Sequence, residues 1–300
     1  MSDAFLGIDI GGTASRWVLV GTDGAIISRG SAGGATGHTF NPAEREKLAG
    51  VLNAIKVASP ALPLAITIGA TGLGPRAYDD VKAMLHEAFG IPATAADTMD
   101  DMELAYRAVF APSTGHLIAA GTGSVGLTIA PDGTIIRVGG RGLLIDDGGS
   151  GTWIALRALD LLYRRIDETG GPADASIMAG LLFDAMGGDT WDDTRAFIYG
   201  GDRGRIGQLA QQVAAAASAG DPVATRILQD AGTELARLGA ALIKRTSRLP
   251  VGYVGGIVRL HPAVKASLLA ALPDDDVLFP EADAALHAAL MARTHHLTTD

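Results

Sequence analysis

The stretch GIDIGGTASRWVLVGTDGAIISRG at residues 7–30 predicts three short strands separated by two turns. The residues at 5–10, 16–20 and 25–29 are mainly apolar or β-branched, as is typical of strands. Gly11-Gly12-Thr13 and the pair Asp23-Gly24 separate them and favour tight turns. The pattern fits an ordinary β-meander or a glycine turn that binds phosphate, and by itself it leaves both open.

The same pattern returns 109 residues further along the chain. Residues 115–139 read GHLIAAGTGSVGLTIAPDGTIIRVG, and eight aligned pairs are identical, including Gly12 with Gly121, Thr13 with Thr122 and Ser15 with Ser124. A chance likeness between glycine-rich strands is the alternative, but we interpret the match as an internal duplication. It predicts a second set of strands at 116–120, 125–130 and 134–138, with Ile118 as the counterpart of Asp9.

Helices and further strands are predicted along the rest of the chain. Asn41, Pro42 and Glu44 form a capping pattern for the first helix. Helices are predicted at 41–58, 76–89, 101–110, 150–165, 173–187, 203–219, 221–247, 262–272 and 282–296, and strands at 64–68, 93–96 and 251–254. The alternation indicates an α/β fold, and the duplication indicates two similar domains, residues 1–112 and 113–282, with a C-terminal helix at 283–300 joined to the first.

Composition limits the classes of function. The chain has 300 residues, 48% of them hydrophobic, and a net charge of −9, which argues against nucleic acid or an anionic membrane as the main partner. The absence of cysteine excludes disulfides, thiolate metal sites and cysteine nucleophiles. Neither a signal peptide nor an apolar run of about 18 residues is visible, so we expect a cytoplasmic protein.

The segment GTGSVG at residues 121–126 matches the dinucleotide fingerprint G-x-G-x-x-G. That fingerprint needs a helix to begin at the glycines, so that the helix N-terminus faces the pyrophosphate. Here the residues that follow, LTIAPDGTIIRV, predict a hairpin. A dinucleotide-binding oxidoreductase is therefore disfavoured.

Two glycine turns that bind one polyphosphate fit the residues better. Glycines at 11, 12, 121 and 123 let backbone N–H groups approach phosphate oxygens, because no Cβ stands in the way. The side chains of Thr13, Ser15, Thr122 and Ser124 could add hydroxyl donors. Asp9 would be repelled by phosphate, but it could hold Mg²⁺ through water.

These motifs give the chain a specific resemblance. DIGGT at 9–13, GTGS at 121–124, DDGGSGTWI at 146–154 and VGGI at 254–257 resemble the BadF/BadG/BcrA/BcrD-type ATPases of the sugar kinase/actin/Hsp70 superfamily, and most of all their N-acetylglucosamine and glucosamine kinases. The resemblance implies two ribonuclease-H-like (actin-like ATPase) domains with a central cleft that takes ATP and Mg²⁺. It adds Gly255 and Gly256 to the residues expected to bind ATP.

The resemblance also implies a catalytic base. In the related kinases an aspartate in an N-D-A-x-x-A stretch accepts the proton of the sugar hydroxyl, and Asp101 of DDMELAY stands at that position, with Asp100 in place of the asparagine. The alternative is that both carboxylates merely begin a helix. Asp97, in the same acidic stretch, is the second choice for the base.

Sugar contacts are implied at Gly72, Asp101 and Asp147. The chain departs from the family pattern at three positions: Gly37, where an asparagine is common, Val125, where some N-acetylglucosamine kinases have asparagine, and Gly148, where glutamate is usual. The first two departures weaken the N-acetyl assignment more than the kinase assignment.

We therefore expect an ATP-dependent kinase that phosphorylates an amino sugar, most simply N-acetylglucosamine at its 6-hydroxyl. Glucosamine kinase and a nucleotide-driven switch without a sugar substrate are the alternatives, and a homodimer is left open. His295 and His296 are expected in a solvated tail, and Trp153 and Trp191 in the core.

Overall fold

The computed structural model describes residues 3–299, and the chain packs as two compact units. Unit 1 consists of residues 1–110 and 282–300, and unit 2 of residues 111–281. Each unit is built on one five-stranded sheet. The predicted α/β fold with two similar domains is confirmed.

The sheet of unit 1 has the strand order β3-β2-β1-β4-β5. Its strands are β1 (Ala4–Ile10), β2 (Ala14–Gly21), β3 (Ile26–Gly33), β4 (Ala65–Ala70) and β5 (Ala96–Asp100). The first three form an antiparallel meander, whereas β4 pairs parallel to β1, and β5 parallel to β4. The carboxyl ends of β1, β4 and β5 therefore meet at one edge of the sheet.

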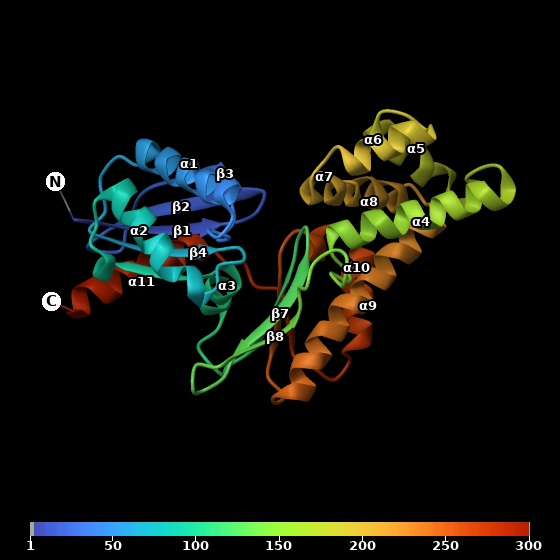
Figure 1. The fold of residues 1–300 in the computed structure, drawn as a ribbon. Coiled ribbons are helices and arrows are strands. Elements are labelled where there is room, and N and C mark those ends of the chain that lie inside the picture. Colours follow the sequence, from blue (N-terminus) through green and yellow to red (C-terminus); the bar gives the residue numbers. More distant parts are fainter. Residues whose placement is uncertain (1–2, 300) are drawn as a thin grey trace. The chain divides into compact units, whose positions relative to one another are not determined.

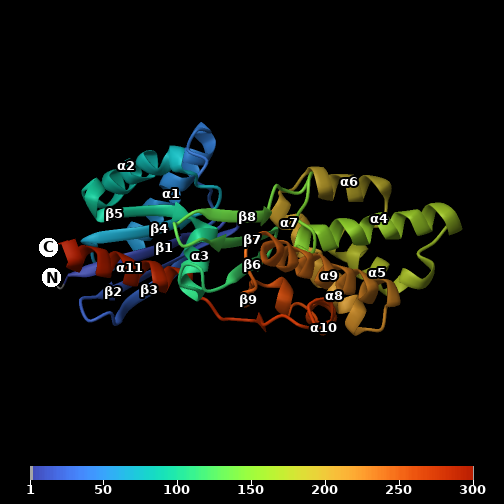
Figure 2. The same cartoon turned by 90° about the horizontal axis from the view of Figure 1, so that it is seen from below.

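Helices cover both faces of this sheet. They are α1 (Pro42–Ala58), α2 (Tyr78–Phe89), α3 (Asp101–Val109) and α11 (Ala284–Thr299). The apolar side chains of α1 and α2 pack with those of β1 and β4 in one core, and α11 packs on the opposite face (Figure 2). Asn41 caps α1 as predicted, but the carboxylate of Glu44 accepts a hydrogen bond from Thr36.

The sheet of unit 2 has the order β10-β9-β6-β7-β8, which repeats that of unit 1 strand for strand. Its strands are β6 (His116–Ala120), β7 (Ser124–Ile129), β8 (Ile135–Gly139), β9 (Val251–Val254) and β10 (Val277–Leu278). Again β6, β7 and β8 are antiparallel, and β9 and β10 continue the sheet in parallel. The shared topology supports the duplication.

The predicted register of the duplication is wrong by one position for the first strand of each set. Ile10 lies opposite Ser15 in unit 1, whereas Ala120 lies opposite Ser124 in unit 2. The second turn is therefore one residue shorter than the first. The counterpart of Asp9 is Ala119, and Ile118 instead points into the core.

Unit 2 carries most of the helices. They are α4 (Gly151–Thr169), α5 (Ser176–Met186), α6 (Trp191–Tyr199), α7 (Arg203–Gln208), α8 (Ala210–Ser218), α9 (Pro222–Arg245) and α10 (Pro262–Ala271). The longest, α9, runs beside β7 and β8 (Figure 1) and also packs on β6. Its buried face consists mainly of leucine and alanine side chains.

Several predicted elements differ from the structure. Residues 93–95 form a short 3₁₀ helix, and the strand follows at 96–100. The helix predicted at 203–219 is two helices that meet at Leu209, and α6 and β10 were not predicted. Trp191 is 70% exposed beneath the guanidinium of Arg195, so its expected place in the core is wrong.

Helix α11 lies unusually close to β1. A Cβ on Gly7 would stand 2.1 Å from the carbonyl oxygen of Ala285 and 2.2 Å from the backbone nitrogen of Ala289. Phe5 and Val18 pack against the alanines of α11 beside this point. Only a glycine at position 7 lets helix and strand approach so closely, because backbone atoms cannot move aside as side chains do.

We expect Gly7→Ala to lower the free energy of unfolding by about 1–3 kcal/mol or more, as overpacking in a core does. Gly50→Ala is the matched control, because Gly50 lies inside α1 and nothing stands within 4 Å of its added Cβ. That control should gain roughly 0.5–1 kcal/mol through helix propensity. Urea unfolding measures both, and equal stability of the two variants would contradict the close packing.

Candidate active site

The carboxyl ends of β1, β4 and β5 bring three polar residues to one edge of the unit 1 sheet. Asp9 is the penultimate residue of β1, Thr71 follows β4 and Asp101 follows β5. In open α/β sheets, ligands bind outside the carboxyl ends of parallel strands. This edge is therefore the candidate site of unit 1.

Asp101 is held in place by a neighbouring strand end. The hydroxyl of Thr71 donates to Asp101 Oδ2 at 2.5 Å, and Thr71 N donates to the carbonyl oxygen of Ile10 at 2.9 Å. Asp100 has a different role, because its carboxylate caps α3 by accepting from Met102 N at 3.0 Å. The two adjacent aspartates thus have different roles. Asp100 caps the helix, and Asp101 is held in one orientation at the sheet edge.

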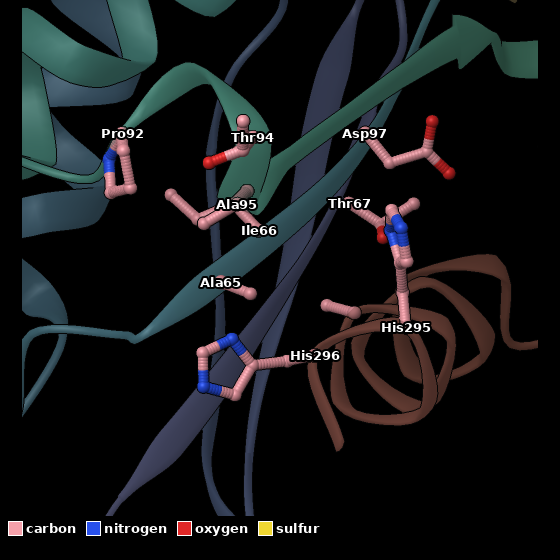
Figure 3. A pocket seen from close by; sticks show the side chains of 10 residues that line it. Ala65, Ile66, Thr67, Pro92, Thr94, Ala95, Asp97, His295 and His296 are labelled. Carbon is pink, nitrogen blue, oxygen red and sulfur yellow. The ribbon is translucent and has the colours of Figure 1, made fainter. Parts of the chain in front are cut away.

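Asp97 is not brought to this edge. At about 3.3 Å per strand residue, it lies about 10 Å from Asp100 along β5. It lines a pocket of about 170 Å³ together with Thr67, His295 and His296 (Figure 3). His296 lies 5.6 Å from the ring of Phe5, so it packs on the sheet rather than extending into solvent as expected.

Asp9 is in an environment where a bound cation would stabilise its ionised carboxylate. Burial raises its pKa above the usual 3.8, Arg16 on the neighbouring strand lowers it in part, and Asp283 raises it. No cluster of three or more histidine and acidic side chains able to hold a metal occurs within residues 3–299. A metal at Asp9 would therefore take its other ligands from water and substrate, as Mg²⁺ commonly does.

The turn of residues 11–15 presents exposed backbone beside Asp9. A Cβ on Gly11 would strike the turn's own backbone at Ala14, 2.7 Å away, whereas nothing lies within 4 Å of a Cβ on Gly12. Ser15 is buried, and its hydroxyl donates to the carbonyl oxygen of Gly33 at 2.7 Å. The exposed hydroxyl of the turn is that of Thr13.

Gly72 has a structural reason to be glycine. Its φ is +73°, and a Cβ there would lie 2.3 Å from Nε2 of His38. Gly37, one of the departures from the family pattern, packs on Leu73 and donates its N–H to the carbonyl oxygen of Thr71 at 2.9 Å. The loop that carries Gly37 and His38 thus lies against the turn that carries Gly72.

The turn of residues 121–124 in unit 2 is tied to the start of α4. Thr152 donates from its hydroxyl to the carbonyl oxygen of Thr122 at 2.7 Å, and Gly151 N donates to that of Gly121 at 2.9 Å. The Ser124 hydroxyl is buried and donates to the carbonyl oxygen of Gly148 at 2.8 Å. Ser15 and Ser124 therefore both brace their turns from inside.

Asp147 lies beneath this turn. The residue is 3% exposed and has a φ of +90°, which is strained for a residue with a Cβ. Its Oδ2 is 3.7 Å from Nη1 of Arg203, and both carboxylate oxygens lie 3.2 Å from where a Cβ on Gly123 would stand. Burial raises its pKa, which Arg203 and the N–H of Ser124 lower in part. A sugar could reach this carboxylate only after a local rearrangement.

Two glycines of unit 2 are explained by their neighbours. A Cβ on Gly148 would lie 2.6 Å from Oε2 of Glu234 on α9, so a carboxylate stands beside the position where the family usually has glutamate. Gly255 has a φ of +105° and packs on the carbonyl oxygen of Ala120, whereas Gly256 is exposed and uncrowded. Glu234 and Arg203 were not predicted, because no nearby motif marks them.

Two α/β units of one topology, each with a glycine turn after its first strand, define an actin-like ATPase fold. The chain belongs to the BadF/BadG/BcrA/BcrD ATPase family, whose model matches residues 6–291.

The chain is also similar to three individual proteins. An N-acetylmuramic acid/N-acetylglucosamine kinase of Clostridium acetobutylicum is 26% identical over 65% of this chain and 66% of that protein, just under two thirds of its length. An N-acetyl-D-glucosamine kinase of Dictyostelium discoideum is 24% identical over 97% of this chain and 98% of that protein. A solved structure from Chromobacterium violaceum, provisionally assigned as an N-acetylglucosamine kinase, superposes with a TM-score of 0.76 at 24% identity over 97% and 99% of the two chains.

Over the part of the chain that the structure describes, no helix combines the length and the apolar composition that crossing a membrane requires.

We expect Asp9→Asn to raise the melting temperature at pH 7. Since burial raises the pKa of Asp9, the folded protein binds an extra proton between pH 3.8 and the raised pKa, and this group's contribution to stability falls as the pH rises through that window. The amide removes the ionised group, so the gain should shrink as the pH is lowered toward 4. Calorimetry from pH 4 to 8 measures it, with exposed Asp189→Asn as control. A lower melting temperature at pH 7 would contradict the burial argument.

We expect Gly12→Ala and Gly121→Ala to fold normally, because nothing lies within 4 Å of either added Cβ. If the exposed backbone of these turns binds phosphate, both methyl groups should weaken ATP binding by roughly tenfold through loss of close approach. Isothermal titration calorimetry with Mg²⁺–ATP measures this, and Gly50→Ala is the control. Unchanged affinity in Gly121→Ala would show that the second turn is only part of the architecture.

Proposed function

We propose that this chain is an ATP-dependent kinase that phosphorylates N-acetylglucosamine at its 6-hydroxyl. The observation that carries the proposal is the Asp101 carboxylate, oriented by Thr71 at the sheet edge that also holds Asp9 and an exposed glycine turn. Phosphoryl transfer needs these three functions: a proton acceptor, a metal ligand and donors for phosphate. The names of the two relatives support the choice of sugar.

Asp101 would accept the proton of the attacking hydroxyl. Thr71 donates to Oδ2, and Met102 N, whose proton is shared with the cap at Asp100, donates to Oδ1 at 2.9 Å, so the carboxylate cannot rotate freely. General-base catalysis requires a carboxylate that is already oriented and within reach of the attacking hydroxyl.

Asp9 would hold Mg²⁺ through water, and the metal would neutralise charge on the phosphates. The phosphate donors proposed are Gly11, Gly12, Thr13 and Ser15 from unit 1 and Gly121, Thr122, Gly123, Ser124, Gly255 and Gly256 from unit 2. Ser15 would contribute its backbone N–H, because its hydroxyl already donates within the fold. The hydroxyl of Ser124 donates to Gly148 and its N–H donates to Asp147 Oδ1 at 3.5 Å, so Ser124 could donate to phosphate only by exchanging a partner.

The sugar would contact Gly72 and Asp101 in unit 1 and Asp147 in unit 2. Gly72 belongs to the turn against which His38 packs, so His38 stands close to the proposed sugar. Asp147 can take part only if its carboxylate becomes accessible, since it is buried in this structure.

A sugar panel tests the proposal. ADP release is followed with Mg²⁺–ATP and, in turn, N-acetylglucosamine, glucosamine, N-acetylmuramic acid and glucose. We expect N-acetylglucosamine to give the highest kcat/KM. Asp101→Asn should lower kcat by roughly 10²–10⁴-fold, the range for loss of a general base, while the sugar Kd changes far less.

Asp97→Asn is the matched control, because Asp97 lies on β5, the strand that leads to Asp101, and away from the edge. A higher kcat/KM for glucosamine would replace the substrate but keep the kinase. ATP binding without transfer to any sugar would favour a nucleotide-driven switch. Loss of activity in Asp97→Asn together with full activity in Asp101→Asn would reverse the assignment of the base.

A further inference from the structure

We propose that Arg203 contacts the polyphosphate of the bound nucleotide at the Gly121–Ser124 turn, and that Asp147 is the residue that positions it. This inference rests on the proposed ATP-dependent function and adds a residue that the sequence motifs do not contain. It concerns unit 2 alone.

The position of the guanidinium is the first argument. Nη2 of Arg203 lies 3.1 Å from where a Cβ on Gly123 would stand, so the guanidinium borders the glycine turn. Arg203 is the first residue of α7, which is packed against α4. A Cβ on Gly207 of the same helix would lie 3.4 Å from Cγ2 of Thr122. The helix thus holds Arg203 beside the turn.

The state of the guanidinium is the second argument. The side chain of Arg203 is 47% exposed, and its Nη1 lies 3.7 Å from Asp147 Oδ2. A charge-assisted hydrogen bond is shorter, at about 2.7–2.9 Å. Arginine has five N–H donors in a planar fork. The guanidinium can therefore face Asp147 on one side and still offer donors to a second anion.

The carboxylate supplies the third argument. Oδ2 of Asp147 is buried and makes no hydrogen bond, and the backbone of the residue is strained at a φ of +90°. A buried carboxylate needs a nearby positive charge, because loss of hydration is otherwise uncompensated. Arg203 supplies that charge, and in return Asp147 restrains a side chain that would be mobile at the surface. Phosphate oxygens on the turn would meet a guanidinium already in place.

The chain offers a matched control two residues away. Arg205 lies on the same short helix, but its guanidinium stacks 4.2 Å from the ring centre of Phe197. Arg203→Gln and Arg205→Gln remove the same charge from the same helix, so a general effect of charge or of helix stability would affect both. Arg203→Lys keeps the charge and removes the planar fork.

The first measurement is binding of Mg²⁺–ATP without sugar, by isothermal titration calorimetry. We expect Arg203→Gln to weaken binding about tenfold or more, Arg203→Lys to weaken it less, and Arg205→Gln to leave it within twofold of the wild type. This measurement does not depend on sugar transfer, so it tests Arg203 even if no sugar in the panel is phosphorylated. In that case the proposed kinase function fails, and an ATP affinity of Arg203→Gln within twofold of that of Arg205→Gln would by itself overturn the inference about Arg203.

The second measurement is turnover with the best sugar of the panel. We expect Arg203→Gln to lower kcat by about 10²-fold, as loss of one donor to transition-state charge does. A loss in kcat with unchanged ATP affinity also supports the contact, since it would then form in the transition state. Affinity and kcat both within twofold of Arg205→Gln would overturn it.

Asp147→Asn tests the positioning role, and asparagine tolerates the left-handed backbone at this position. We expect weaker Mg²⁺–ATP binding, and in the double variant Asp147→Asn/Arg203→Gln no further loss beyond that of Arg203→Gln. A raised KM for sugar with unchanged ATP binding would overturn the positioning role and assign Asp147 to sugar alone.

Discussion

Parallel pairing of β1 with β4 and of β4 with β5 is the constraint on which the candidate site depends. Three strand ends meet at one edge because the register sets Asp9 beside Gly69 and Ala70 beside Asp100. The hydrogen bonds of Thr71 to Ile10 and to Asp101 then join the three ends directly. A shift of one residue in either ladder would turn every side chain to the other face and separate the base from the metal ligand.

Residues near the glycine turns were predictable because local sequence determines them. Short runs of apolar and β-branched residues predicted β1, β2, β6 and β7, and the glycines between them predicted the turns. The assignment of Asp101 as the base came from the resemblance of DDMELAY to the family stretch and stays a prediction, whereas the alternative that the acidic pair begins a helix holds for Asp100, which caps α3. The register of the duplication was harder, since one turn is a residue shorter and glycines align equally well either way.

Other features could not be read from neighbouring residues. Glu234 stands beside Gly148 through the packing of α9, far along the chain, so the carboxylate missing from the loop is present in space. The break at Leu209 keeps a helical backbone between the two helices, and only Gly207, two residues earlier, gives a local sign of it. Helix α6 did have a signal, since Thr190 and Asp193 form a capping box, but its exposed tryptophan gave no apolar face toward a core.

The packing of α11 on β1 has a consequence for how the chain is made. Unit 2 is one continuous segment, whereas the sheet of unit 1 receives a covering helix from the opposite end of the sequence. During synthesis the strands of unit 1 leave the ribosome before α11 does, so the face that holds Phe5 and Val18 stays uncovered until α11 emerges. Unit 2 can therefore complete its core before unit 1, although it is translated later, and a nascent chain halted before Ala284 would expose an apolar sheet surface that chaperones recognise.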